Sequence, residues 1–96
     1  MKERDIERYL VKRVKEMGGE VRKVRWIGRK SAPDRRVMLP QLQVWVELKR
    51  PREGATPAQA REHVRMWKMG ERVVVINSKE GVDSLLNLRR LEGLKT

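Results

Sequence analysis

Residues 33–49 of the chain read PDRRVMLPQLQVWVELK, and this stretch decides the fold. Apolar residues alternate along its second half, and a Pro-Gln turn separates that half from a shorter apolar run. The pattern predicts two strands, 34–39 and 42–48, joined as a β-hairpin. Asp34 begins the first strand and Glu47 ends the second. The hairpin is therefore expected to bring two carboxylates to one end of a sheet.

Helical and strand patterns extend on both sides of this hairpin. Apolar residues at helical spacing end at a Gly-Gly pair, and Thr56-Pro57-Ala58-Gln59 provides an N-cap, a proline at the first helical position and a capping-box glutamine. The expected elements, in chain order, are helix 3–17, strand 20–27, strands 34–39 and 42–48, helix 56–69, strand 72–76 and helix 78–88.

The order αβββαβα predicts an α/β fold of the α+β type, in one domain spanning residues 1–96. The first three strands follow one another closely and are expected to form an antiparallel meander. A helix separates the last two strands, which allows them to be parallel neighbours through a right-handed crossover. A mixed sheet flanked by helices follows.

The charge of the chain indicates its class of partner. Its 96 residues carry a net charge of +11, which favours a polyanion such as nucleic acid. The basic residues are spread over strands and helices, which argues against a membrane surface, and no apolar stretch approaches the length of a membrane span. The charged N-terminus is unlike a signal peptide, so we expect a cytoplasmic protein.

Metal chemistry is restricted by the same composition. The chain has no cysteine and a single histidine, His63, so a metal would take oxygen ligands. Asp34, Glu47 and the backbone carbonyl of Leu48 suit Mg²⁺, which prefers such donors and keeps several waters. Lys49 lies two positions after Glu47 on the same strand face, where its ammonium could orient water or stabilise charge on a phosphate.

Pro33-Asp34 followed by Glu47-Leu48-Lys49, in this order of elements, resembles the PD-(D/E)XK nuclease superfamily with its restriction-endonuclease-like core. Ile-Glu-Arg-Tyr-Leu in the first helix, the Gly-Gly pair, Ser-Ala-Pro-Asp-Arg, Val-Glu-Leu-Lys and Thr-Pro-Ala-Gln narrow the resemblance to the virus-type replication-repair nuclease domain, VRR-NUC. It covers roughly residues 6–86 and is of the stand-alone, phage-like kind.

The resemblance implies an activity and a set of residues. It implies a DNA endonuclease that requires Mg²⁺ or Mn²⁺ and no small-molecule cofactor. It also implies selectivity for branched DNA, with stand-alone members similar to Holliday-junction resolvases of archaea and phages that work as homodimers in DNA repair. The implied catalytic residues are Glu7, Asp34, Glu47, Lys49 and Gln59, with Glu7 as a further candidate for the metal shell.

Each of these residues also has a simpler interpretation. Asp34 could be a turn residue, and Glu47 an exposed carboxylate paired with Lys49. Glu7 could serve the helix dipole, and Gln59 the capping box alone. A duplex or flap nuclease, a nickase, and a non-catalytic nucleic-acid-binding module therefore remain as alternative functions.

Five basic residues lie in loops or strand ends next to the proposed carboxylates and are candidates to hold DNA phosphates: Arg29, Lys30, Arg35, Arg50 and Arg52. Trp26 is the aromatic residue expected to contact DNA, Trp67 is expected in the core, and Trp45 is expected to face the other helix layer or a partner subunit. His63 is expected to be a surface or flanking helical residue.

Overall fold

The computed structural model describes the backbone of residues 1–95 and the side chains of residues 1–87. The predicted order of elements is confirmed. The elements are α1 (Glu3–Glu16), β1 (Glu20–Lys23), β2 (Arg35–Leu39), β3 (Leu42–Leu48), α2 (Pro57–Lys68), β4 (Val73–Ile76) and α3 (Lys79–Lys95).

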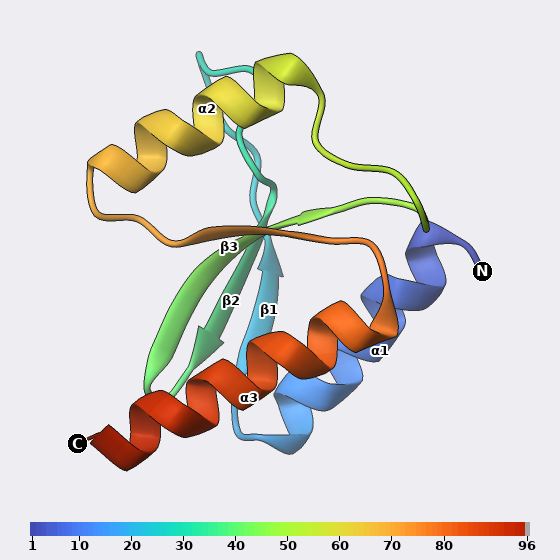
Figure 1. Cartoon of the computed structure of the whole chain (residues 1–96), viewed down its shortest axis with the longest axis vertical. Coiled ribbons are helices and arrows are strands. Elements are labelled where there is room, and N and C mark those ends of the chain that lie inside the picture. The colour runs from blue at the N-terminus through green and yellow to red at the C-terminus, as the bar shows by residue number, and fades with distance from the viewer. Residues whose placement is uncertain (96) are drawn as a thin grey trace.

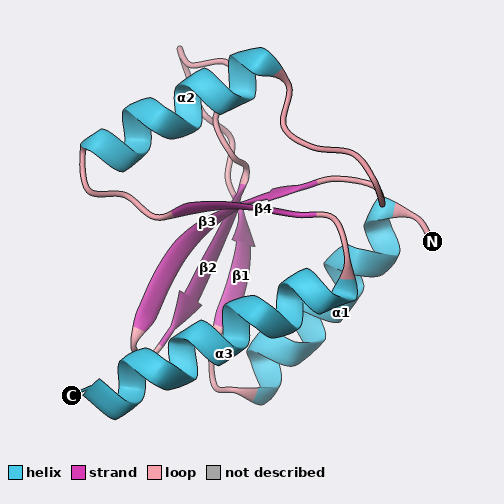
Figure 2. Ribbon diagram, in the orientation of Figure 1, coloured by secondary structure: helices cyan, strands magenta, loops and turns pink. Residues whose placement is uncertain are grey.

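A four-stranded mixed sheet organises the molecule (Figure 2). Its strand order is β1-β2-β3-β4, so the strands are neighbours in the order in which they occur in the chain. The first three strands pair antiparallel. After β3 the chain passes through α2, and β4 then pairs parallel with β3. Both the predicted meander and the predicted parallel crossover are confirmed.

Helices cover the two faces of the sheet unequally. Figure 1 shows α1 and α3 together on one face and α2 alone on the other. The main core lies on the face of α1 and α3, because the alternate residues of β3 that point there are apolar. Its fully or nearly fully buried members include Ile6, Leu10, Val14, Val37, Leu42, Val44, Val46, Ile76, Val82 and Leu86.

The layer between α2 and the sheet is more polar. Met66 is buried there, but so are Glu62 and His63, at 3% and 2% exposure. His63 was expected to be a surface or flanking helical residue; it belongs to α2 and is buried, so the surface alternative is wrong. Trp67, expected in the core, is 53% exposed. Its ring lies at the rim because the indole Nε1–H donates a 3.0 Å hydrogen bond to the carbonyl of Val73.

The first strand is shorter than the sequence pattern predicted. β1 ends at Lys23, and its last link to β2 is a 2.9 Å bond from the amide of Val24 to the carbonyl of Asp34. The chain then leaves the sheet. Trp26 donates from Nε1 to the Pro33 carbonyl at 2.8 Å, while Ile27 is 95% exposed. This bond ties the two ends of the loop together, immediately before Asp34.

α3 continues to Lys95, past the predicted end at Leu88, whose side chain lies outside the described ones. Trp45 faces the α2 layer, as expected, and its ring lies 5.0 Å from that of Trp26. Within residues 1–95, no helix has both the length and the apolar character needed to cross a bilayer.

Candidate active site

The pairing of β2 with β3 determines where the two predicted carboxylates lie. Arg35 is opposite Val46 in this antiparallel pair, so the same register continued by one step sets Asp34 opposite Glu47. Residues directly opposite one another in such a pair project from the same face at close range. Lys49, two residues beyond Glu47, also lies toward the α2 side. The hairpin therefore brings Asp34, Glu47 and Lys49 together, as predicted.

Glu47 occupies an unusual environment for a carboxylate. The residue is only 8% exposed. Burial raises its pKa to about 7; the charge of Lys49 acts to lower it and that of Asp34 to raise it further. The alternative of an exposed strand carboxylate is therefore wrong for Glu47. Ionising a buried carboxyl group beside a second carboxylate is energetically unfavourable unless a cation binds next to it.

The imidazole of His63 faces Glu47 from α2. Its Nε2 lies 3.6 Å from Oε1 of Glu47, and both atoms are buried without a hydrogen-bond partner among the described residues. Burial lowers the pKa of His63, which favours the neutral ring. Sequence reasoning missed this neighbour. The available signal was its position one turn after Gln59, which places both residues on one helix face.

Arg35 links the two other acids of the predicted set. Its guanidinium pairs with Glu7 of α1 and lies 2.8 Å from Oδ1 of Asp34. The Arg35 side chain is 11% exposed, so it lies mostly inside the fold, toward α1. Glu7 thus reaches the site through Arg35. Among the side chains of residues 1–87, no three acidic or histidine groups converge closely enough to form a ready metal cluster.

Gln59 takes part in the predicted capping box. Thr56 caps α2 by accepting a 3.1 Å bond from the Gln59 amide, and the Gln59 side-chain oxygen accepts from the Thr56 amide at 2.9 Å. This confirms the local structure of the helix start. It leaves the role of Gln59 in the site as a prediction, like that of the Leu48 carbonyl.

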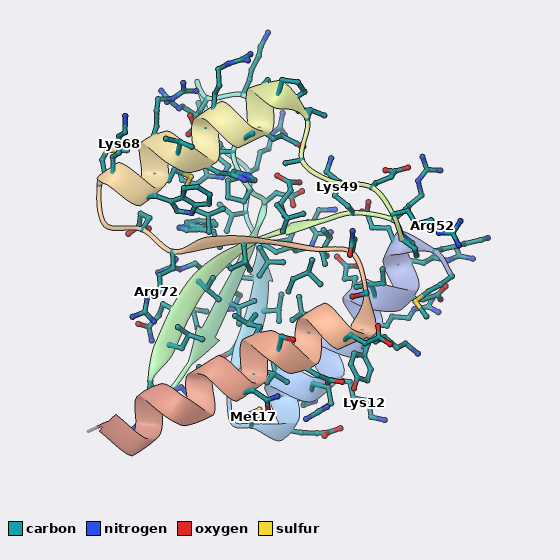
Figure 3. The ribbon with its side chains drawn as sticks, in the orientation of Figure 1. Lys12, Met17, Lys49, Arg52, Lys68 and Arg72 are labelled. Atoms are coloured by element: carbon teal, nitrogen blue, oxygen red, sulfur yellow. The ribbon has the colours of Figure 1, made fainter. Side chains whose placement is uncertain are left out.

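The basic residues predicted to hold DNA differ in their surroundings. Arg29 forms a two-point ion pair with buried Glu62, at 2.6 and 3.0 Å, and so holds the loop against α2. Arg50 pairs with Glu53 at the exposed turn before α2. Lys30 and Arg52 are exposed. Figure 3 places Lys49 and Arg52 at the same end of the molecule, where the chain passes from β3 to α2.

The residues present fit a divalent cation with oxygen ligands. The Glu47 carboxylate is almost fully buried, and the charge of nearby Asp34 raises its pKa. A cation between these two carboxylates would relieve both the burial and the repulsion, and hard cations commonly bind through one or two carboxylates with waters completing the shell. Lys49 and Arg35 supply the positive charge that surrounds the pair.

The fold is that of a nuclease domain, as two comparisons with known proteins show. No family model matches the chain. A solved structure described as a VRR_NUC domain superposes with a TM-score of 0.80 at 36% identity, over 91% of this chain and 97% of that one. "Putative nuclease p44" of Acyrthosiphon pisum secondary endosymbiont phage 1 is 41% identical over 81 residues, which cover 83% of this chain and 87% of that protein. The chain belongs to the VRR-NUC family of nucleases.

Proposed function

We propose that the protein is a Mg²⁺- or Mn²⁺-dependent endonuclease that hydrolyses phosphodiester bonds in branched DNA. The observation that carries the proposal is the burial of Glu47 beside the half-exposed Asp34 and Lys49, because two carboxylates next to an ammonium have the donor set for a cation bound against a phosphate. The whole activity is assigned to one domain, residues 1–96.

Asp34, Glu47 and the carbonyl of Leu48 would hold the cation. When bound, the cation supplies Lewis-acid stabilisation of the phosphate and a more acidic water. Lys49 orients the attacking water and stabilises the charge that develops on the phosphate oxygens. Hydrolysis forms one bond from water oxygen to phosphorus and breaks the bond to the leaving oxygen, which ends with a proton.

Glu7 and Arg35 have supporting roles in this proposal. Arg35 lies between Glu7 and Asp34 and forms an ion pair with each. Glu7 holds the guanidinium from α1, which orients Asp34 toward Glu47. We therefore assign Arg35 to the positioning of the carboxylates, while Lys30, Arg50 and Arg52 remain the candidates for direct phosphate contacts at this end of the sheet.

The finer substrate proposal rests on geometry and on the family. Each chain offers one site, whereas symmetric cleavage of a four-way junction requires two incisions related by a two-fold axis, so we propose a homodimer acting as a Holliday-junction resolvase in repair or replication. The charge of the chain supports DNA as partner, and we place the protein inside the cell. A flap or duplex nuclease, a nickase or a binding module are the outcomes that would replace this proposal.

A cleavage panel with matched variants tests the proposal. Four-way junctions, flaps and linear duplexes are incubated with the wild type, Glu47→Gln and Asp34→Asn, with and without Mg²⁺, and Glu20→Gln on exposed β1 serves as control. We expect cutting of junctions only with metal, and its loss in the two site variants with DNA affinity retained. Equal rates on all three substrates would contradict the preference for branched DNA. Cleavage by Glu47→Gln would contradict the assignment of the active site.

A further inference from the structure

The two oxygens of the Glu47 carboxylate lie in different surroundings. Oε1 is buried against His63 and accepts no hydrogen bond. Oε2 is not among the buried side-chain atoms that lack a hydrogen-bond partner, and the Glu47 side chain keeps 10% of its surface exposed. The carboxylate therefore presents one oxygen to the interior of the α2 layer and the other to the open side of the site.

We propose that His63 is a positioning residue that holds Oε1 of Glu47 through its Nε2–H, and so aims Oε2 at the cation beside Asp34. The inference rests on the proposed function, because it assigns the support of one proposed metal ligand. His63 does not contact the reacting atoms in this arrangement. Its effect on cleavage passes through the orientation of Glu47.

The distance and the burial support a donor at Nε2. Two buried acceptors that face each other without a proton would each lose the hydrogen bond they had in water, which costs roughly 1–3 kcal/mol per group. A proton between them removes that cost. Nε2 and Oε1 are 3.6 Å apart, so a small rotation of either side chain brings them within the roughly 3 Å range of N–H···O bonds. A carboxylate that serves as a metal ligand acts as an acceptor, so the donor in this contact is the Nε2–H of the neutral imidazole.

The fold holds α2 in the orientation that this contact needs. Glu62, next to His63, is 3% exposed and is bound by Arg29 at 2.6 Å and by Arg65 at 2.8 Å. Arg29 belongs to the loop that leads to Asp34. The Glu62 pair therefore joins α2 to the same segment that supplies the second carboxylate, which fixes how His63 sits above Glu47.

Mn²⁺ binding provides the first test, because it measures the site without requiring cleavage. His63→Leu removes the donor, His63→Gln retains an N–H, and Met66→Leu is the control for a buried change on the same helix. We expect His63→Leu to weaken Mn²⁺ binding by roughly 10- to 100-fold, as loss of a group that supports a ligand typically does. We expect His63→Gln to recover most of that loss, and Met66→Leu to bind like the wild type.

Free Mn²⁺ is quantified by electron paramagnetic resonance, and the melting temperature of each metal-free variant is measured in parallel. A lower melting temperature for His63→Leu with unchanged Mn²⁺ binding would show a purely structural role and overturn the inference. If the wild type binds no Mn²⁺ and cleaves nothing, the proposed function and this inference both fail. If it binds and His63→Leu binds equally well, only the inference fails.

The tautomer of His63 gives a second readout. His63 is the only histidine of the chain, so its imidazole ¹⁵N signals in NMR are free of overlap. We expect the Mg²⁺-loaded protein to carry the proton on Nε2 and a free lone pair on Nδ1. A ring protonated only on Nδ1 in that protein would place two acceptors face to face and overturn the assignment.

Discussion

At the scale of the residue, Glu47 is where folding and function oppose each other. Its burial raises the pKa to about 7, so the unaided fold favours the protonated acid at the pH at which a metal ligand must be ionised. Functional sites commonly retain such strain because a cation bound at the site offsets it. The side chain should therefore lower the stability of the metal-free protein while serving the site.

Glu47→Gln tests this opposition through the pH dependence of stability. The unfolded chain releases the Glu47 proton near pH 4.5, whereas the folded chain keeps it until about pH 7. The folded state binds more protons in this range, so wild-type stability falls as pH rises from 4.5 to 7, by at most about 3 kcal/mol. The Glu47→Gln variant has no titratable group at this position, so its stability does not fall for this reason. Urea unfolding without metal should show similar stability at pH 5 and a more stable variant at pH 8.

A control separates this effect from the general charge of the chain. Glu20→Gln removes an acid from an exposed position on β1, where it pairs with Arg22 on the surface. We expect little change in its pH profile relative to wild type. A Glu47→Gln protein that tracks the wild type at both pH values would show that burial does not hold the proton on Glu47.

The residues of this site were predictable to different degrees. Asp34 and Glu47 could be found from the sequence because a hairpin register is short-range and its alternation is visible in the apolar residues. The position of His63 one turn after Gln59 was a signal, but whether that helix face meets Glu47 depends on how α2 rotates over the sheet. That rotation is set by the pair between Arg29 and Glu62, residues far apart in the chain. The pairing of Arg35 with Glu7 could not be read from the sequence for the same reason, since Glu7 comes from α1, and the DNA contact predicted for Arg35 stays a prediction.

At the scale of the element, the start of α2 combines a structural and a proposed catalytic role. Thr56 and Gln59 share the reciprocal bonds of the capping box. Removing either side chain should lower the free energy of unfolding by about 1 kcal/mol. If Gln59 also serves the site, Gln59→Ala should reduce cleavage further than Thr56→Ala at matched stability. Equal cleavage by the two variants would leave Gln59 as a cap only.

The turn between α1 and β1 depends on a glycine for lack of space. A Cβ on Gly19 would come 2.4 Å from the carbonyl oxygen of Met38 and 2.8 Å from a methyl of Leu39. Since a backbone atom cannot move aside alone, Gly19→Ala should shift β1 away from β2 and cost roughly 1–3 kcal/mol. Thermal or urea unfolding measures this cost. A stable Gly19→Ala protein would contradict the close packing of this turn.

Capping and alternation made the elements of this fold predictable, and the errors occurred where partners lie far away. α2 begins as its capping residues indicated. β1 was predicted too long because the alternation continues past Lys23, while the bond from Trp26 to Pro33 diverts the chain. Trp67 was misplaced because the face of α2 that meets the sheet is occupied by Glu62 and His63, which leaves the aromatic ring at the rim.

At the scale of the whole molecule, the net charge of +11 is divided between paired and unpaired groups. Arg29 and Arg65 both bind Glu62, whose carboxylate balances one of their two positive charges. Lys30 and Arg61 line the same hollow between the loop and α2 and have no ion pair within residues 1–87. This hollow lies beside the segment that leads to Asp34, so both cations are candidates to hold DNA near the proposed site. Arg61 was not among the predicted DNA contacts.

The dependence of DNA binding on salt tests this division of charge. Each phosphate contact adds nearly one unit to the slope of log K against log salt. The double variant with Lys30→Ala and Arg61→Ala should therefore reduce the slope by about 2 and weaken binding to all DNA sequences alike. A double variant with Lys12→Ala and Lys68→Ala removes the same charge from α1 and from the end of α2 remote from Lys49 in Figure 3. It should change the slope by much less, and equal losses in the two pairs would mean that the hollow has no special role.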